Sequence, residues 1–223
     1  MHTTRSLFFA PTTLSTFALA ALFALFTTAC DDPTKGKAKA TTENVTQAAT
    51  GTATPPQAGV AYKFDGASSQ ITWVGSKVTD QHKGSFDTFN GTIHLVDNVP
   101  EKSSVNVEID AASLTADATK LTEHLKSNEF FDVAKFTKIT FTSTNVKAGG
   151  DKGASHTVTG NLSLHGVTKA LTFPATIAVS GDQISVNAEF ALNRKDFGIT
   201  YPGKPDDLIR DEALVKLAIV AKK

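Results

Sequence analysis

Apolar and polar residues alternate with a period of two through most of residues 60–223. In one such run, Val105, Val107 and Ile109 are separated by polar residues. Because successive side chains of a β-strand point to opposite faces, the pattern predicts antiparallel strands with one apolar and one polar face. A short piece at 60–65 precedes the main predicted strands, which span residues 69–78, 86–96, 103–111, 137–147, 155–165, 169–179, 183–193 and 213–222.

One segment departs from this period. Leu121 and Leu125 lie four residues apart within 117–128, which predicts a helix of about three turns with Thr115 or Asp117 as its N-cap. The pair Asn90-Gly91 lies inside the second predicted strand, where it predicts a bulge or a tight bend.

Strands this regular all need partners at their edges, which favours a closed barrel over an open sheet. The predicted fold class is therefore all-β: an eight-stranded antiparallel barrel with a short helical insertion between the third and fourth strands. A barrel of this size is either filled by side chains or holds one small ligand. Its apolar face mixes large residues with Gly75, Gly91, Gly160, Ala175 and Ala188. These small residues would leave a slot or let phenylalanine rings interlock, and both interpretations stay open.

Residues 1–30 have the character of an export signal. An apolar run over residues 17–26 follows Arg5 and is too short for a membrane span. The run is followed by Cys30, the only cysteine in the chain. This arrangement resembles a bacterial lipobox, in which the cysteine is acylated and anchors the protein to a membrane. Ordinary secretion with cleavage near Ala29, or an uncleaved anchor, are the alternatives.

Residues 31–59 are rich in Thr, Ala, Lys and Pro and contain no aromatic residue. With so little apolar surface to offset the entropy of ordering, the segment is predicted to be a flexible linker. The predicted organisation is thus a lipoprotein-type signal over 1–30, a linker over 31–59 and a barrel domain over 60–223.

Charge and motifs exclude several functions. The chain carries 22 Lys+Arg against 22 Asp+Glu, so it lacks the basic excess that nucleic-acid binding requires. It contains no phosphate loop, nucleophile elbow or His-Glu-x-x-His motif, and its histidines lack metal-ligand spacing. We therefore expect no enzyme activity, no metal and no cofactor. Arg194 is expected to pin a loop through carboxylates, or Arg194 or Lys195 contacts a polar ligand head group.

Four motifs in order resemble the YceI-like family: residues 82–91, 124–132 with 136–141, 158–169, and 194–199. The resemblance covers residues 60–223 and departs from the family at Phe136-Thr137, where an aromatic residue is usually followed by Pro. It implies a lipocalin-like barrel in an exported protein without established catalytic residues. It also implies that polyisoprenoids such as prenylated quinones, or other amphiphiles, bind in the lumen.

An apolar ligand in the lumen would contact the inward-facing set of the alternating pattern. The candidate lining residues are Ile93, Leu95, Val107, Ile109, Phe141, Leu162, Leu164, Phe173, Ile177, Phe190, Leu217 and Ile219, with Leu121, Leu125, Phe130 and Phe131 as a mouth or lid. We expect a non-enzymatic carrier of a polyisoprenoid or similar lipid in the periplasm or cell envelope, anchored to a membrane through Cys30. The alternative is a structural or adhesion module with a filled core that works through its outer surface.

Overall fold

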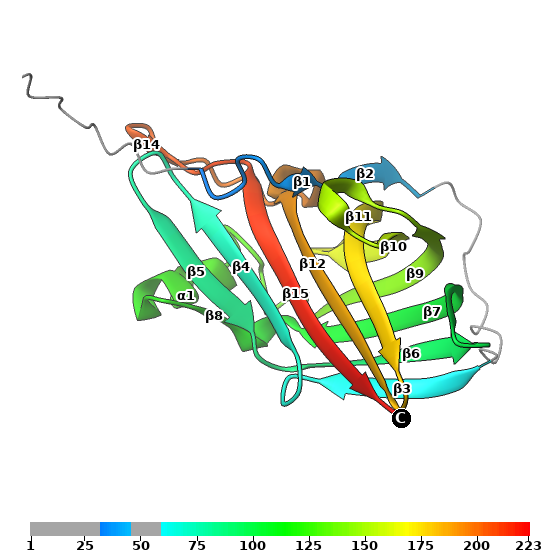
Figure 1. Cartoon of the computed structure of the whole chain (residues 1–223). Coiled ribbons are helices and arrows are strands. Elements are labelled where there is room, and N and C mark those ends of the chain that lie inside the picture. The colour runs from blue at the N-terminus through cyan, green and yellow to red at the C-terminus, as the bar shows by residue number, and fades with distance from the viewer. Residues whose placement is uncertain (1–31, 46–58) are drawn as a thin grey trace, which may run out of the picture.

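A computed structural model describes residues 32–45 and 59–223 of the chain (Figure 1). Most of these residues lie in strands. The strands are β1 (Ala38–Lys39), β2 (Thr41–Asn44), β3 (Val60–Asp65), β4 (Gln70–Ser76), β5 (Gln81–Phe86), β6 (Phe89–Val96), β7 (Val99–Asp110), β8 (Leu114–Ala116), β9 (Lys138–Ala148), β10 (His156–Leu164), β11 (Val167–Ser180), β12 (Gln183–Asn193), β13 (Gly203–Lys204), β14 (Asp207–Leu208) and β15 (Glu212–Lys222). The helices are α1 (Thr119–Lys126) and the short 3-10 segments η1 (Ala111–Ser113), η2 (Asp151–Gly153) and η3 (Arg194–Phe197).

Eight strands form a closed antiparallel barrel, which confirms the predicted fold class. One member differs from the prediction: β3, expected only as a short preceding piece, belongs to the ring, whereas β4, expected as the first main strand, lies outside it. The order of the eight strands is β12-β11-β10-β9-β7-β6-β3-β15, and pairing of β15 with β12 closes the ring. On its other edge, β15 pairs with β3 only through Lys222 and Lys63, and with β4 along residues 214–218. The sheet therefore continues beyond the ring through β4, β5 and β8, which lie beside α1 at one end of the barrel (Figure 1).

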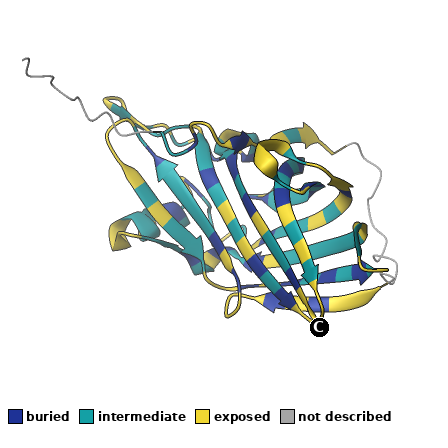
Figure 2. Cartoon of the chain, viewed as in Figure 1, coloured by how far each residue is buried: buried dark blue, intermediate teal, exposed yellow. Residues whose placement is uncertain are grey.

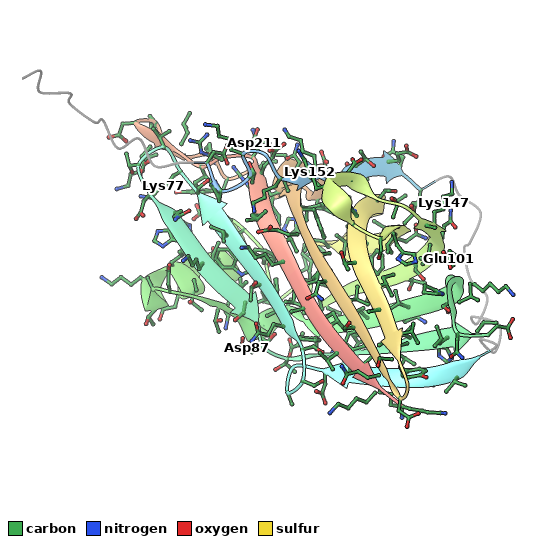
Figure 3. All side chains as sticks on the ribbon, viewed as in Figure 1. Lys77, Asp87, Glu101, Lys147, Lys152 and Asp211 are labelled. Atoms are coloured by element: carbon green, nitrogen blue, oxygen red, sulfur yellow. The ribbon has the colours of Figure 1, made fainter. Side chains whose placement is uncertain are left out.

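The period-two pattern decides which side chains face the interior. Along β6, Ile93 and Leu95 are buried, whereas His94 between them is more exposed. Figure 2 shows the same banding along β12 and β15. Charged side chains, including Lys77, Lys147 and Asp211, lie at the periphery (Figure 3). Alternation thus places hydrocarbon inside the ring and charge outside it.

The predicted helix is confirmed in type and place, since α1 lies between β8 and β9. It is shorter than the predicted 117–128 and turns Leu125 into the core, with Leu121 packed against the same cluster. No helix in the described ranges has the length and apolar character needed to cross a bilayer.

The predicted N-cap of this helix is wrong. Ala118 occupies the N-cap position and makes no side-chain capping hydrogen bond. The Asp117 carboxylate instead accepts hydrogen bonds from the Lys83 backbone N–H (3.0 Å) and from Nδ1 of His82 (2.8 Å). Both donors belong to the neighbouring strand β5. The Asp117 carboxylate therefore bonds to β5 and not to the free amides at the start of the helix.

Strand β5 was not predicted, and the strand expected from residue 86 begins at Phe89. Most residues of β5 are polar or Gly, so it lacks an apolar alternation, and its partners β4 and β8 supply its hydrogen bonds. Gly84 is required within it because a Cβ there would lie 2.2 Å from the Trp73 ring.

The bulge predicted at Asn90-Gly91 is also wrong. Both residues keep regular register with β3 and β7, and the irregularity of β6 lies between His94 and Val96. A Cβ at Gly91 would lie 2.1 Å from the Phe64 ring, so the glycine serves a close packing contact and not a bend.

The predicted flexible linker is wrong for the described residues 32–45. Residues 176–180 of β11 pair with residues 183–187 of β12. Outside these residues the two strands do not pair with each other, which leaves a gap between their facing edges. β1 pairs with β12 and β2 pairs with β11 in that gap. Ala38 is only 6% exposed there. Backbone pairing supplies the stabilisation that the sparse apolar residues of this segment cannot. The predicted signal segment with Cys30, and the rest of the linker over 46–58, lie outside the described residues.

A charged side chain in the gap between β11 and β12 should break the pairing of residues 38–44 with these two strands. We expect Ala38→Glu to bury an unpaired carboxylate and so to lower hydrogen-exchange protection by about tenfold or more in β2 and at the Ala40 amide, which donates to the Ala191 carbonyl (2.9 Å). Glu43→Ala, at an exposed position of β2, is the control and should leave protection unchanged. Equal protection in both variants would contradict the docked arrangement.

Candidate functional site: an apolar lumen and a chamber beneath helix α1

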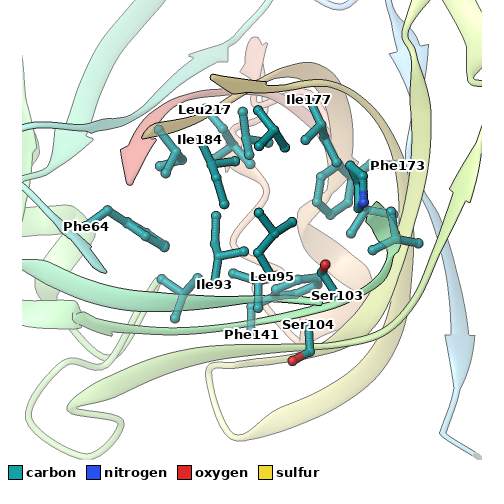
Figure 4. A pocket seen from close by; sticks show the side chains of 18 of the residues that line it. Phe64, Ile93, Leu95, Ser103, Ser104, Phe141, Phe173, Ile177, Ile184 and Leu217 are labelled. Atoms are coloured by element: carbon teal, nitrogen blue, oxygen red, sulfur yellow. The ribbon is translucent and has the colours of Figure 1, made fainter. Parts of the chain in front are cut away.

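The barrel encloses an apolar lumen (Figure 4). The cavity has a volume of about 110 Å³, and its exposed lining is apolar throughout. Ile93 and Leu95 of β6 face Ile184 of β12 and Leu217 of β15 across it (Figure 4). Apolar cavities of about 150 Å³ stay dry and admit a benzene-sized guest. In this conformation, the lumen therefore fits one short hydrocarbon segment.

Two glycines make room for phenylalanine rings in the wall of the lumen. A Cβ at Gly91 would lie 2.1 Å from the ring of Phe64, and one at Gly160 would lie 2.4 Å from the ring of Phe141. Both rings line the cavity. The sequence left two interpretations open, and each holds for part of the interior. The rings pack against the glycines, and a cavity remains beside them.

The structure divides the predicted lumen residues into two groups. Those that line the lumen are Ile93, Leu95, Val107, Phe141, Phe173, Ile177, Leu217 and Ile219. Those that pack in the core without lining it are Ile109, Leu162, Leu164 and Phe190. The barrel interior is longer than the cavity, so inward-facing residues beyond it contact one another. Contact with a ligand stays a prediction for every member of the set.

Sequence reasoning missed further lumen residues. They are Phe64, Ile71, Pro100, Ser103, Ser104, Val105, Val146, Val158, Val179, Ile184 and Val186. The period-two rule identifies Ile184 and Val186, which belong to a recognised alternating run. Pro100 lies in the part of β7 that precedes the predicted strand start, so no alternation marked it.

A second cavity of about 340 Å³ lies beneath α1, where β4 and β5 leave the ring; we call it the α1 chamber. Its lining includes Leu121, Leu125, Phe130 and Phe131, the predicted mouth or lid residues. Phe130 also packs against Tyr201, with ring centroids 5.0 Å apart. The structure thus brings the four together at a cavity distinct from the lumen, and their role as a lid stays a prediction.

Ionisable groups around the α1 chamber are largely paired. The pairs are Lys77 with Asp207 (2.7 Å), Glu212 with Lys39 (2.7 Å), Arg210 with Asp32 (3.4 Å), His82 with Asp117 (2.8 Å) and His124 with Glu129 (2.6 Å). The hydrogen bond from Lys77 lowers the pKa of Asp207 and the same bond raises the pKa of Lys77. The described part of the chain has no cluster of three His, Cys, Asp or Glu residues suited to a metal ion.

The contacts of Arg194 are those of a residue that positions a loop. Its guanidinium donates to the carbonyls of Ile199 (2.7 Å), Arg210 (3.1 Å) and Ile209 (3.4 Å). Burial lowers the pKa of Arg194, and the Asp211 carboxylate opposes this shift. Lys195 forms an ion pair with Asp211 (2.9 Å) and does not line the α1 chamber. The geometry supports the loop-pinning alternative, mostly through carbonyls, and the head-group role of both residues stays a prediction.

A closed eight-stranded antiparallel barrel around an apolar cavity has the architecture of the lipocalin-like barrels. The model of the YceI-like domain matches residues 62–221. The chain therefore belongs to the YceI-like family.

Relatives and solved structures agree with this assignment. A UPF0312 protein from Pseudomonas fluorescens is 38% identical over 151 residues, which cover 64% of this chain and 78% of that protein. A UPF0312 protein from Pseudomonas putida is 40% identical over 126 residues, or 54% of this chain, and the match spans just under two thirds (65%) of the relative's length.

Two solved structures share the fold. BcnA from Burkholderia cenocepacia matches with a TM-score of 0.64 at 23% identity, covering 71% of this chain and 99% of that one. A polyisoprenoid binding domain from Saccharophagus degradans matches with a TM-score of 0.57 at 18% identity, covering 72% of this chain and 97% of that one.

The Asp117 contact at the chamber rim generates a pH dependence. The backbone N–H of Lys83 and the ring of His82 lower the pKa of Asp117, against an opposing effect of burial. Because the folded-state pKa is depressed, the contact stabilises the fold above the ordinary Asp pKa and is lost as pH falls through the lowered value. Between about pH 6 and pH 3, the wild type should lose more unfolding free energy than Asp117→Asn.

The difference should stay below about 1 kcal/mol, because the Asp117 side chain is 45% exposed and solvent screens its charge. Urea unfolding midpoints at both pH values measure it, with Asp182→Asn, at an 83% exposed side chain, as the control. Identical acid sensitivity in the wild type and Asp117→Asn would contradict this role.

Proposed function

We propose that this protein binds a polyisoprenoid or a similar amphiphilic lipid in the barrel lumen, without changing it chemically. The observation that carries the proposal is a ring-enclosed cavity whose exposed lining is apolar throughout. Of the described residues that line the lumen, all but two serines have hydrocarbon side chains. Such a surface recognises hydrocarbon and offers no side chain that would transfer a proton near neutral pH.

The energetics set a minimum length for the ligand. Each buried methylene contributes about 0.8 kcal/mol, so a five-carbon isoprene unit contributes about 4 kcal/mol before the costs of binding. Micromolar affinity corresponds to about 8 kcal/mol and therefore needs about two buried units or more. The cavity of about 110 Å³ holds less than that, so wall side chains such as Ile177 and Leu217 have to rotate when a longer chain enters.

Two comparisons favour an isoprenoid among the apolar ligands. The chain belongs to the YceI-like family, and one structure with the same fold is described as a polyisoprenoid binding domain.

We also propose that the protein works at the cell envelope, anchored by acylation of Cys30. Only Asp31 separates Cys30 from Asp32, and the Asp32 carboxylate contacts Arg210 at the α1 chamber (3.4 Å). An acyl group at Cys30 would hold the barrel close to the bilayer with the chamber end toward it. That arrangement would shorten the path of a lipid between membrane and barrel.

A substitution that fills the lumen should weaken lipid binding. We expect Val186→Phe, at the cavity wall, to lower the amount of co-purifying lipid by at least about fivefold, because an overpacked site costs about 1–3 kcal/mol. Native mass spectrometry of the gently purified full chain measures bound lipid as a mass increment. The matched control is Ser185→Phe, whose side chain points to the opposite face of β12 and should leave binding unchanged.

A wild-type protein that carries no lipid and takes up no prenylquinone would refute the proposal. It would leave the alternative of a module with a filled core that acts through its outer surface. Equal lipid content in Val186→Phe and Ser185→Phe would place any bound lipid outside the lumen.

Acylation is tested separately. Cells fed a radioactive fatty acid should label the wild-type protein, and Cys30→Ala should lose the label completely because the acceptor thiol is the only one in the chain. Ser6→Ala, within the signal segment but away from the thiol, is the control and should keep the label. Labelling of Cys30→Ala, or an unlabelled wild type, would contradict the proposed anchor.

A further inference from the structure

Two exposed aliphatic side chains lie beside each other at one tip of the molecule. Among the described residues, Val78 (56% exposed) and Leu208 (50% exposed) are the most exposed of the large hydrophobic side chains. Val78 lies in the connection between β4 and β5, and Leu208 is the last residue of β14 in the β13–β14 hairpin. Figure 1 shows β14 and β3 at opposite ends of the molecule.

The register of the two loops places both side chains on one face. Lys77 pairs with Ile209 in an isolated antiparallel bridge. In the same register Val78 lies opposite Leu208, and directly opposite residues of an antiparallel pair point to the same face. On the other side of Leu208 its partner is Gly203, which has no side chain to cover it. We call Val78 and Leu208 the tip pair.

Polar contacts hold the two loops together on the other face. The Asp207 carboxylate accepts a hydrogen bond from the Thr79 hydroxyl (2.9 Å) and forms an ion pair with Lys77 (2.7 Å). Lys77 and Asp207 line the α1 chamber. Because side chains alternate along an extended chain, the tip pair points away from that cavity and into the surroundings of the protein.

The exposed apolar surface of the tip extends beyond this pair. Pro202 and Pro205, beside and within the same hairpin, are also exposed. Scattered single hydrophobic residues are normal on a protein surface, whereas adjoining ones indicate contact with another protein or with a membrane. The tip therefore has the character of a contact surface, and its place in the fold favours one of these partners.

The course of the chain brings a membrane to this tip. The Asp32 carboxylate contacts Arg210 (3.4 Å), which follows Leu208 by two residues. Consecutive Cα atoms are about 3.8 Å apart, so the Cα of Cys30 lies within about 8 Å of the Cα of Asp32. A lipid anchor on Cys30, as proposed above, would therefore hold the bilayer surface next to the tip pair.

The charges of the tip favour a zwitterionic lipid surface. Residues 77–80 and 202–208 contain Lys77 and Lys204 against Asp80, Asp206 and Asp207. Such a surface lacks the cationic excess that anionic membranes attract, so its contact with a bilayer depends on aliphatic side chains that leave water. Two such side chains bind weakly alone, but a nearby anchor raises their effective concentration at the bilayer.

We propose that Val78 and Leu208 insert into the surface of a zwitterionic bilayer and hold this end of the barrel against the lipid. An anchor at Cys30 fixes one point of the protein and leaves it free to rotate, whereas the anchor and the tip pair together fix its orientation. The inference rests on the proposed anchor and adds a noncovalent contact to it. It does not depend on which ligand the lumen binds.

Quenching by brominated lipid tests this contact. The full chain is reconstituted in vesicles of phosphatidylcholine brominated along its acyl chains, and the wild type, whose only tryptophan is Trp73, gives the background. Leu208→Trp should increase the quenched fluorescence at least about twofold, because an inserted side chain reaches the acyl chains. Val60→Trp, at another exposed valine, is the matched control and should add no quenching. Its strand β3 meets β15 only at Lys222, ten residues and about 34 Å along β15 from Glu212.

A charge beside the reporter provides a second comparison. Val78→Asp, added to Leu208→Trp, should remove at least about half of the added quenching, because a carboxylate resists transfer into hydrocarbon. Val60→Asp, added to the same reporter, should leave the quenching unchanged. Brominated phosphatidylglycerol should quench no more strongly than brominated phosphatidylcholine.

The outcomes separate the tip contact from the anchor. Vesicle-bound protein in which Leu208→Trp is quenched no more than Val60→Trp would overturn the tip contact and leave the anchor intact. Protein that does not associate with vesicles would overturn both, while lipid binding in the lumen is measured separately by mass spectrometry. Stronger quenching by phosphatidylglycerol would overturn the preference for a zwitterionic surface. A dimer that Val78→Asp dissociates, without quenching by lipid, would assign the tip pair to a second copy of the chain and overturn the bilayer contact.

Discussion

Backbone hydrogen bonding between β12 and β15 is the constraint on which this barrel depends. The two strands pair without interruption from Gln183 and Lys222 to Asn193 and Glu212. Because β12 is also bonded to β11, this pairing joins the last strand of the chain to the rest of the sheet and closes it. Once the ring is closed, the inward residues of every strand share one interior. Period-two alternation then fixes the composition of that interior, and the apolar lumen follows from it.

Strand pairing around the ring is incomplete at two places, and the distinctive features of the protein lie there. β11 and β12 separate beyond residues 176–180, and the segment with β1 and β2 fills the gap. At another edge, β15 exchanges its pairing with β3 for pairing with β4, and the α1 chamber forms where the extended strands meet the helix. The lumen gives apolar surface for a hydrocarbon chain, and the α1 chamber is a separate cavity at the end of the interior where polar and apolar side chains both line the wall.

The sequence predicts the parts of this structure whose signal is local. Alternation in β6, β10, β11 and β12 identified these strands to within a few residues, and the Leu121 and Leu125 spacing identified α1. β1 and β2 gave no such signal because their partners, β12 and β11, are distant in sequence, and β5 gave none because most of its residues are polar or Gly. Gly91 has the local features of a bend, and the ring of Phe64 on another strand decides otherwise.

The site was predicted less completely than the fold for the same reason. Parity along a strand shows which residues face inward, but it does not show where along the barrel a cavity remains, so Leu164 and Phe190 were assigned to a wall that they do not reach. Trp73, Ser76 and Arg210 line the α1 chamber, and only the tertiary fold brings β4 close to the loop before β15.

The most direct test of the central claim is a crystal structure of the full chain purified gently from its own membranes. Lipid binding in the lumen predicts elongated ligand density enclosed by the ring, in contact with Phe64, Phe173 and Ile184, with these side chains displaced from one another to admit it. A lumen closed by its own side chains in that crystal, with lipid seated only on the outer surface of the sheet, would contradict the account.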